Sequence, residues 1–195
     1  MTDHNDRRLL NSLRAGRSEA YTELVHCHYR SVYRFLLHMI RDVHRAEDLT
    51  QETFTTAWER INTFQGRSTL GTWLHRIAYT KFIDGQRTVR REATIRERHS
   101  SSSVAADDPL EAAMATDDAR RLHQALDALD SAERAVLVLH YMQGLSYREM
   151  AAVLDEPTGT VKWRTREALN GLRILLGEEF REHAISKVAE LGPIS

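Results

Sequence analysis

The stretch of residues 99–109 constrains the fold more than any other feature of the sequence. Four consecutive serines run into an Asp-Asp-Pro triplet, and the stretch shows neither helical nor strand periodicity. Such residues resist regular structure, so we predict a flexible linker here. The linker divides the 195-residue chain into two segments, each below about 100 residues, and domains of that size bury only modest cores.

Both segments have the composition of helical proteins. The chain contains only 9 glycines and 3 prolines, 42% of its residues are hydrophobic, and Ala, Leu, Arg and Glu are common. This composition favours helices over strands. We therefore predict an all-α fold of two small helical domains. Helices are expected at residues 6–15, 18–41, 43–61, 69–91 (with a break offered by Gly85), 109–128, 131–142, 146–154 and 158–176.

The helices and the linker together define the expected domain organisation. We place the first domain at residues 8–95, the flexible linker at 96–113 and the second domain at 114–178. A tail with no assigned role follows at 179–195.

The cysteine and hydropathy patterns indicate the cellular compartment. Cys27 is the single cysteine, which excludes an intramolecular disulfide and suits a reducing environment. The N-terminus lacks the apolar core of a signal peptide, and no stretch approaches the roughly 18 apolar residues of a membrane helix. We expect a cytoplasmic protein without membrane insertion.

The 10 histidines raise the question of a metal site. His26 and His28 flank Cys27, but residues i and i+2 of a helix point about 200° apart and cannot bind one ion together. The other histidines are scattered without ligand spacing. We therefore expect no metal and no cofactor, and we interpret Cys27 as a packed or half-exposed thiol.

The formal net charge of −1 hides a strong asymmetry. Residues 76–98 hold seven basic residues against three acidic ones, and residues 158–173 hold four against one. Between these basic stripes, residues 100–130 carry 2 basic and 7 acidic residues. The pattern is typical of a chain that contacts a polyanion at two places, although two solvated helix faces would produce it as well.

The segment of residues 43–61 is amphipathic and has an acidic outer face. Its apolar side is expected in the core and comprises Leu49, Phe54, Ala57, Trp58 and Ile61. The opposite side comprises Asp48, Glu52, Thr55 and Glu59, with Gln51 at the edge. Taken alone, this is an ordinary helix with a solvated face.

A loop of small residues at 63–69 precedes a helix in which aromatic residues lie beside Arg76, Lys81 and Arg87. Aromatic and basic residues together suit unstacked bases and phosphates. The spacing of core residues is shown by Trp73, Leu74, Ile77 and Ala78. We therefore expect the loop, rather than Trp73, to contact bases and phosphates.

Residues 145–169 contain the sharpest local pattern. A short helix, a tight turn at 155–157 and a basic second helix predict a helix-turn-helix motif. A helix of this kind fits the major groove, its N-terminal amides favour phosphate, and its Lys and Arg side chains reach base edges. Short helix pairs also occur in proteins that never bind DNA, and the basic stripe favours binding here. The seam that holds the motif is expected to be Val161, Ala168, Leu169, Leu172, Leu175 and Leu176.

Four patterns occur together in one order. They are DLTQETF at residues 48–54, WLHRIA at 73–78, the serine-rich linker, and LSYREMA at 145–151 followed by GTVK at 159–162. In this combination the chain resembles the bacterial extracytoplasmic-function (ECF) sigma factors, group 4 of the RNA polymerase sigma factors, over residues 8–176.

The resemblance implies a transcription initiation factor rather than an enzyme. Such a factor binds core RNA polymerase, opens and reads the minus-ten promoter element with its first domain, and recognises the minus-thirty-five element with its second. Many relatives respond to stress or another signal and are held by an anti-sigma factor, so the resemblance implies that partner too.

The resemblance also implies roles for individual residues. Contacts with the clamp coiled coil of polymerase would come from Asp48, Gln51, Glu52 and Thr55. An extruded base and the minus-ten strand would be contacted by Phe64, Gln65, Gly66, Arg67, Ser68, Arg76, Thr80, Lys81 and Arg87. Contacts with the minus-thirty-five element would come from Thr158, Thr160, Lys162, Arg164 and Arg166.

The chain departs from the family pattern at four positions in or near these sites. Thr80 replaces the usual Asn, which we expect to alter minus-ten selectivity, and Asp155 replaces the usual Gly of the turn. Asp tolerates a left-handed conformation better than most residues, so the turn should survive. Trp163 and Thr165 replace Ser and Leu, which predicts a different minus-thirty-five element or a further partner surface.

Two other functions stay open on the sequence alone. A stand-alone helix-turn-helix regulator would bind symmetric half-sites as a dimer without polymerase. A helical enzyme or metal sensor would need convergent ligands, and the chain shows no nucleophile motif, phosphate loop or paired carboxylates.

Overall fold

The computed structural model describes residues 4–96 and 117–177 of the chain. All regular elements within these two ranges are helical, which confirms the predicted all-α class. The chain forms two compact units that separate between Asp108 and Pro109. The predicted linker and tail lie outside the described residues, except for Arg96 at the end of a helix.

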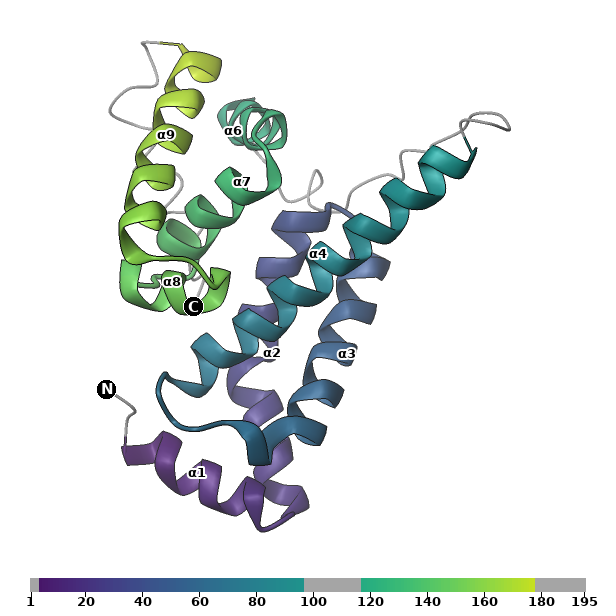
Figure 1. The fold of residues 1–195 in the computed structure, drawn as a ribbon, viewed down its shortest axis with the longest axis vertical. Coiled ribbons are helices and arrows are strands. Elements are labelled where there is room, and N and C mark those ends of the chain that lie inside the picture. The colour runs from purple at the N-terminus through teal and green to yellow at the C-terminus, as the bar shows by residue number, and fades with distance from the viewer. Residues whose placement is uncertain (1–3, 97–116, 178–195) are drawn as a thin grey trace. The chain divides into compact units, whose positions relative to one another are not determined.

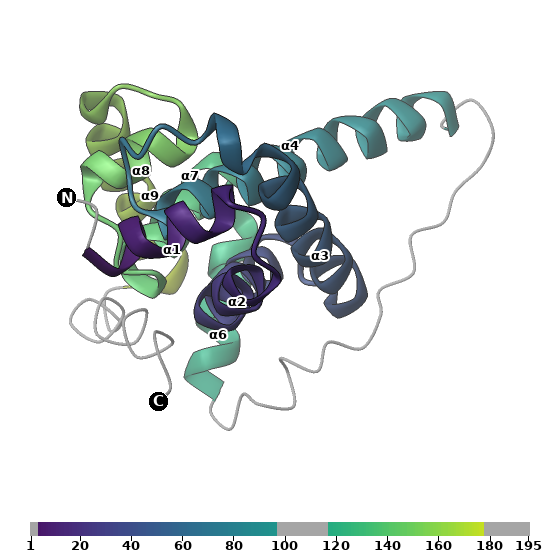
Figure 2. The ribbon, with the colours of Figure 1, turned by 90° about the horizontal axis from the view of Figure 1, so that it is seen from below.

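The first unit is a bundle of three long helices crossed at one end by a fourth. The elements are α1 (His4–Arg14), α2 (Ser18–Ile40), α3 (Val43–Arg60), the 3-10 turn η1 (Ile61–Thr63) and α4 (Leu70–Arg96). Helices α2, α3 and α4 pack against one another lengthwise, and α4 extends past the other two (Figures 1 and 2). Their shared core includes Val32, Phe35, Leu36, Phe54, Leu74 and Ala78.

The helix boundaries in this unit have local causes. Gly16 follows α1 with a φ of 70°, a conformation that glycine adopts readily. Asp42 caps α3 because its side chain accepts a hydrogen bond from the backbone N–H of Arg45 at 3.0 Å. The break offered by Gly85 does not occur, since α4 is continuous through it.

One predicted core residue of this unit is exposed. Trp58 is 38% exposed because it lies near the end of α3, where it makes an edge-to-face contact with Tyr21 at a centroid distance of 5.2 Å. The prediction that Trp58 belongs to the core is therefore wrong. Phe54, Ala57 and Ile61 of the same stripe are buried as expected.

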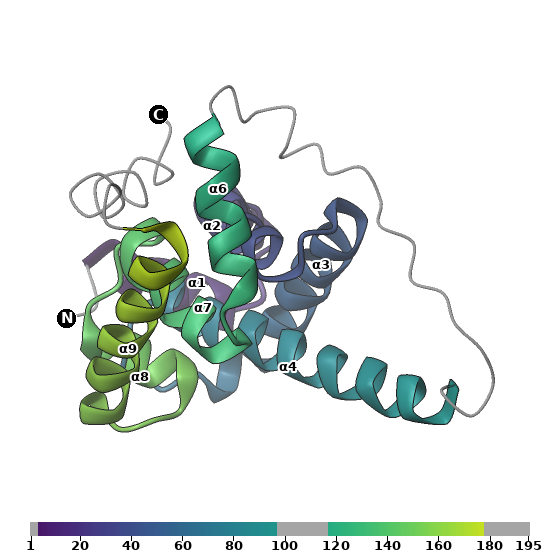
Figure 3. The ribbon, with the colours of Figure 1, turned by 90° about the horizontal axis from the view of Figure 1, so that it is seen from above.

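The second unit packs short helices around one long one. Its elements are α6 (Asp117–Ala128), α7 (Ser131–Leu137), the π-helical turn η2 (Val138–Met142), α8 (Tyr147–Leu154) and α9 (Thr158–Leu176). Helices α6, α7 and α8 all contact α9 (Figure 3). The helix predicted at 131–142 is therefore an α-helix that widens into a π-turn, and residues 109–116 of another predicted helix lie outside the described part.

The seam of α9 agrees with the expectation at most positions. Val161, Ala168, Leu172 and Leu176 are buried. Leu175 is half exposed, so its assignment to the seam is wrong: the stripe that faces α6 and α7 is narrower than the apolar residues of α9. None of the helices in the described ranges is long and apolar enough to cross a membrane.

Candidate functional site

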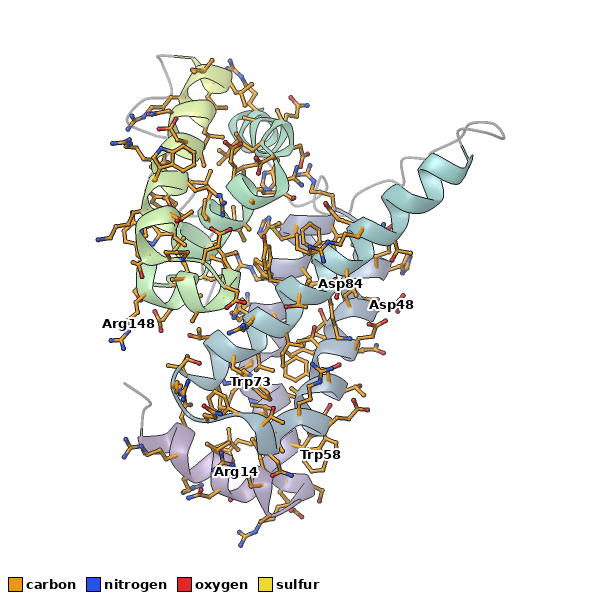
Figure 4. All side chains as sticks on the ribbon, in the orientation of Figure 1. Arg14, Asp48, Trp58, Trp73, Asp84 and Arg148 are labelled. Atoms are coloured by element: carbon orange, nitrogen blue, oxygen red, sulfur yellow. The ribbon has the colours of Figure 1, made fainter. Side chains whose placement is uncertain are left out.

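The outer face of α3 forms an open, mainly acidic groove. Asp48, Gln51, Glu52 and Thr55 are exposed, and with Thr56, Glu59 and Lys81 they line a depression of about 490 Å³. Figure 4 shows Asp48 on the outer side of α3. The structure thus brings together the four residues that the resemblance assigns to polymerase.

Lys81 belongs to this groove rather than to the adjacent face of α4. Its Nζ lies 3.2 Å from Oε2 of Glu52, and its side chain is only 24% exposed. Residues 76, 80 and 87 share one side of α4, whereas residue 81 is rotated by about 100° towards α3. The predicted minus-ten surface is therefore divided, with Lys81 beside the acidic face.

The remaining basic side of α4 is solvent-accessible. Arg76, Thr80 and Arg87 are exposed. The Thr80 hydroxyl donates to the carbonyl oxygen of Arg76 at 2.9 Å, and Arg87 lies 3.5 Å from the Asp84 carboxylate. Exposed pairs of this kind are weak, so Arg87 is available to a phosphate.

The loop between η1 and α4 is anchored by its first residue. Phe64 is 5% exposed, and its ring lies 5.0 Å from that of Trp73. This side chain faces the core, and the backbone N–H of Phe64 donates to the Ile61 carbonyl oxygen at 3.2 Å, so Phe64 shapes the loop rather than its exposed surface. Gln65 and Arg67 are exposed, Ser68 is half-buried, and Gly66 has a φ of 68° that favours glycine.

Helix α1 holds both ends of this loop, an arrangement that the sequence does not predict. Arg14 donates from Nη2 to the carbonyl oxygen of Phe64, and Asp6 accepts a hydrogen bond from the N–H of Leu70 at 3.2 Å. These partners are 50 and 64 residues apart, so no local sequence signal points to them.

Two histidines, His75 of α4 and His28 of α2, lie beside the first turn of α4. His75 is buried, with Nδ1 2.8 Å from the carbonyl oxygen of Gly71 and Nε2 3.4 Å from the Ser31 hydroxyl. Burial lowers the pKa of His28 below its ordinary value, and the nearby Asp6 carboxylate opposes that shift. A Cβ added at Gly71 would lie 3.5 Å from the His28 ring, so the first turn of α4 packs closely against His28.

The helix-turn-helix is stabilised by contacts within its own sequence. Ser146 and Glu149 form a reciprocal capping box at the start of α8. Asp155 ends α8 with a φ of 58°, the left-handed conformation expected for a turn residue. Glu156 in the turn forms an ion pair with Arg164 of α9, and both side chains are less than one third exposed.

The residues predicted to contact the minus-thirty-five element differ in how exposed they are and in the partners they already have. Thr158, Lys162 and Arg166 are exposed, whereas Thr160 and Arg164 are half-buried. Lys162 lies over the Tyr147 ring with Nζ 5.8 Å from its centroid, and Arg166 lies 3.7 Å from Glu167. Arg164 already has a carboxylate partner, so in this structure it supports the turn.

Two residues that depart from the family pattern have opposite environments. Thr165 is buried and donates from its hydroxyl to the Val161 carbonyl oxygen at 2.8 Å. Trp163 is 55% exposed on the side of α9 that faces away from the buried seam. On this outer side, Trp163 is the large apolar residue closest in sequence to Lys162 and Arg166.

The described residues contain no group of three or more His, Cys, Asp or Glu placed to hold a metal ion. Cys27 is exposed, so the packed alternative for its thiol is wrong.

Comparison with known families identifies both units. The family described as sigma-70 region 2 matches residues 24–92, and the family described as sigma-70 region 4 matches residues 119–170. The first match covers all of α3 and most of α2 and α4, and the second covers most of the stretch from α6 to α9.

Individual relatives match most of the chain. It is 36% identical over 172 residues to the ECF RNA polymerase sigma factor SigE of Mycolicibacterium smegmatis, covering 86% of this chain but only 65% of that relative. It is 32% identical over 178 residues to the ECF RNA polymerase sigma factor SigX of Bacillus subtilis, covering 86% of this chain and 90% of that relative.

Solved structures agree with these matches. The sigma factor RpoE, in complex with the anti-sigma factor NepR from Bartonella quintana, is similar with a TM-score of 0.68 and 28% identity over 80% of this chain and 96% of that one. CnrH, in complex with the cytosolic domain of CnrY, is similar with a TM-score of 0.67 and 26% identity over 88% of this chain and 96% of that one. With both sigma regions present in order and a 32% identical relative matched over nearly its whole length, the chain belongs to the ECF RNA polymerase sigma factors.

Proposed function

We propose that the protein is an alternative, group 4 sigma factor that binds core RNA polymerase and directs it to promoters with minus-ten and minus-thirty-five elements. The observation that carries the proposal is the presence of region 2 and region 4 in order, with 26 residues between the two matched ranges. A stand-alone helix-turn-helix regulator would account only for the second range. The role is that of an initiation factor, without catalysis or cofactor, in the cytoplasm where the polymerase works.

The proposed roles follow the surfaces of the two units. The acidic groove of α3 binds polymerase through Asp48, Gln51, Glu52 and Thr55, which are exposed together. The loop and the basic side of α4 hold the minus-ten strand, where stacking and phosphate contacts offset the cost of unstacking a base. The outer side of α9 binds the minus-thirty-five element in the major groove.

The proposed domain boundaries are those expected from the sequence, with the first domain at 8–95, the linker at 96–113, the second domain at 114–178 and the tail at 179–195. They are supported by the separation of the two units between Asp108 and Pro109.

An anti-sigma factor is the proposed regulator, in response to stress or another signal. Support comes from RpoE, whose structure was solved in complex with the anti-sigma factor NepR. A partner of this kind would control the protein by covering its polymerase-binding surfaces.

Transcription from fragmented genomic DNA of the source organism tests the proposal. Purified core polymerase is supplied with and without the protein, and the 5′ ends of the transcripts are mapped by sequencing. We expect new start sites that share two spaced upstream elements. Absence of new starts, together with protection of symmetric DNA sites by the protein alone, would establish the stand-alone regulator instead.

A matched pair of variants links the result to the groove of α3. Asp48→Ala combined with Gln51→Ala should abolish the new starts by weakening polymerase binding. Glu19→Ala removes an exposed acidic residue from α2 and should leave the starts intact. If both variants behave alike, the groove is not the polymerase surface.

A further inference from the structure

Helix α1 lies outside the residues matched to sigma-70 region 2, which begin at residue 24. It crosses the end of the bundle where the loop before α4 begins, as Figures 1 and 2 show. Leu9, Leu10 and Leu13 are buried and hold α1 against the bundle. The burial of these leucines explains why α1 packs against the bundle. The helix also makes polar contacts that this packing does not require.

The polar contacts of α1 reach the two ends of one loop. The Arg14 guanidinium donates to the carbonyl oxygen of Phe64, the first residue of the loop, and Figure 4 labels Arg14 on α1. The Asp6 carboxylate accepts from the backbone N–H of Leu70, the first residue of α4. Residues 6 and 14 are separated by about 12 Å along a rigid helix, so α1 spaces the ends of the loop.

Both contacts are chemically strong for their type. A guanidinium bound to a carbonyl and a carboxylate bound to a backbone N–H are charge-assisted hydrogen bonds. The carboxylate also lies at the N-terminus of α4, where the helix dipole favours negative charge. The loop has no regular secondary structure between residues 64 and 69, so its conformation depends on such fixed points.

We propose that α1 is a positioning element for base capture, in which Asp6 and Arg14 fix the two ends of the loop in the conformation that holds the extruded minus-ten base. The proposal rests on the proposed sigma function. Because its ends are already fixed, the loop does not pay the entropic cost of becoming ordered when the base binds. This preorganisation strengthens binding and sharpens discrimination between bases. Asp6 and Arg14 are positioning residues, since they act through the backbone of the loop.

The experiment uses holoenzyme assembled from core polymerase and the full chain. The variants are Asp6→Asn, Arg14→Ala and the double variant, and the probes are single-stranded DNAs carrying the non-template minus-ten element of a mapped promoter with each base in turn at every position. For the double variant we expect about tenfold weaker binding of the preferred strand and a ratio between preferred and substituted bases that falls towards one.

Three measurements separate positioning from a structural role. The affinity for core polymerase, the affinity for minus-thirty-five duplex and the melting temperature should stay close to wild type, because the three leucines still hold α1. Arg14→Lys should restore part of the base discrimination. Arg8→Ala removes an exposed cation from the same helix and should leave the base ratio unchanged.

The proposal is overturned if the double variant keeps the wild-type base ratio, or if its affinity for core polymerase and its melting temperature fall together with DNA binding. A wild-type holoenzyme that shows no base preference on these strands would instead contradict the proposed sigma function. The two failures are therefore distinguishable.

Discussion

The helix-turn-helix and the loop before α4 are both candidate DNA surfaces, but they are held in different ways. The turn is stabilised by partners close in sequence, since Glu156 and Arg164 are 8 residues apart. The loop is stabilised by Arg14 and Asp6, which are 50 and 64 residues from their partners. The turn before α9 is thus fixed by a contact between residues close in sequence, whereas the order of the loop depends on how α1 packs at the end of the bundle.

The largest effect is expected from Phe64→Ala, which removes the buried anchor of the loop. Truncating a buried Phe should destabilise the first unit by about 3 kcal/mol, through lost burial and the cavity left beside Trp73. Denaturant-dependent hydrogen exchange, read by mass spectrometry, measures each unit separately. Phe64→Leu should cost less. An equal loss of protection in α8 and α9 would show that the second unit is not independent.

A smaller effect, confined to the second unit, is expected from the Glu156–Arg164 pair. Both side chains are less than one third exposed, so a double-mutant cycle with Glu156→Gln and Arg164→Ala should give a coupling energy of about 1 kcal/mol in chemical denaturation. Arg164→Ala should also weaken minus-thirty-five binding, since it loosens the turn.

Two arginines serve as references for that cycle. Arg166→Ala should weaken minus-thirty-five binding with little change in stability, because its side chain is 71% exposed. Arg148→Ala, on the exposed side of α8 (Figure 4), should change stability little. A coupling energy near zero would return Arg164 to the set of direct DNA contacts.

The same difference explains what the sequence could predict. Most helix limits and the helix-turn-helix turn are predictable from the sequence, because Gly16, Ser146 and Asp155 act on neighbouring residues. The burial of Phe64 required knowledge of which distant side chains surround the loop. An apolar stripe likewise does not reveal how much of it a neighbouring helix covers, and for this reason the stripe wrongly predicts core positions for Trp58 and Leu175.

The bundle end that holds the loop should also respond to pH through His28. Burial lowers the folded pKa of His28 below its ordinary value of 6.5, so the unfolded chain binds the proton more readily. The free energy of unfolding of the first unit should therefore keep its full value above pH 6.5 and decline as the pH falls below 6.5. Asp6→Asn should steepen the decline, because Asp6 opposes the shift. Thermal melts across this range, with His28→Asn as the control that removes the slope, measure the effect.

The smallest effect is expected for the Glu52–Lys81 pair, which joins the acidic groove to α4. Glu52 is 59% exposed, so the coupling energy should be about 0.2–1 kcal/mol at low salt and should shrink as salt screens the charges. The pair contributes little to stability, but it bears on the functional assignment of Lys81, because Lys81 lies in the groove proposed for polymerase. Lys81→Ala should therefore change the affinity for core polymerase more than the affinity for minus-ten single strands, with Arg76→Ala showing the opposite order. If Lys81→Ala instead weakens only the binding of the DNA strand, the ion pair opens in the holoenzyme, and the groove and the basic side of α4 form one continuous promoter surface.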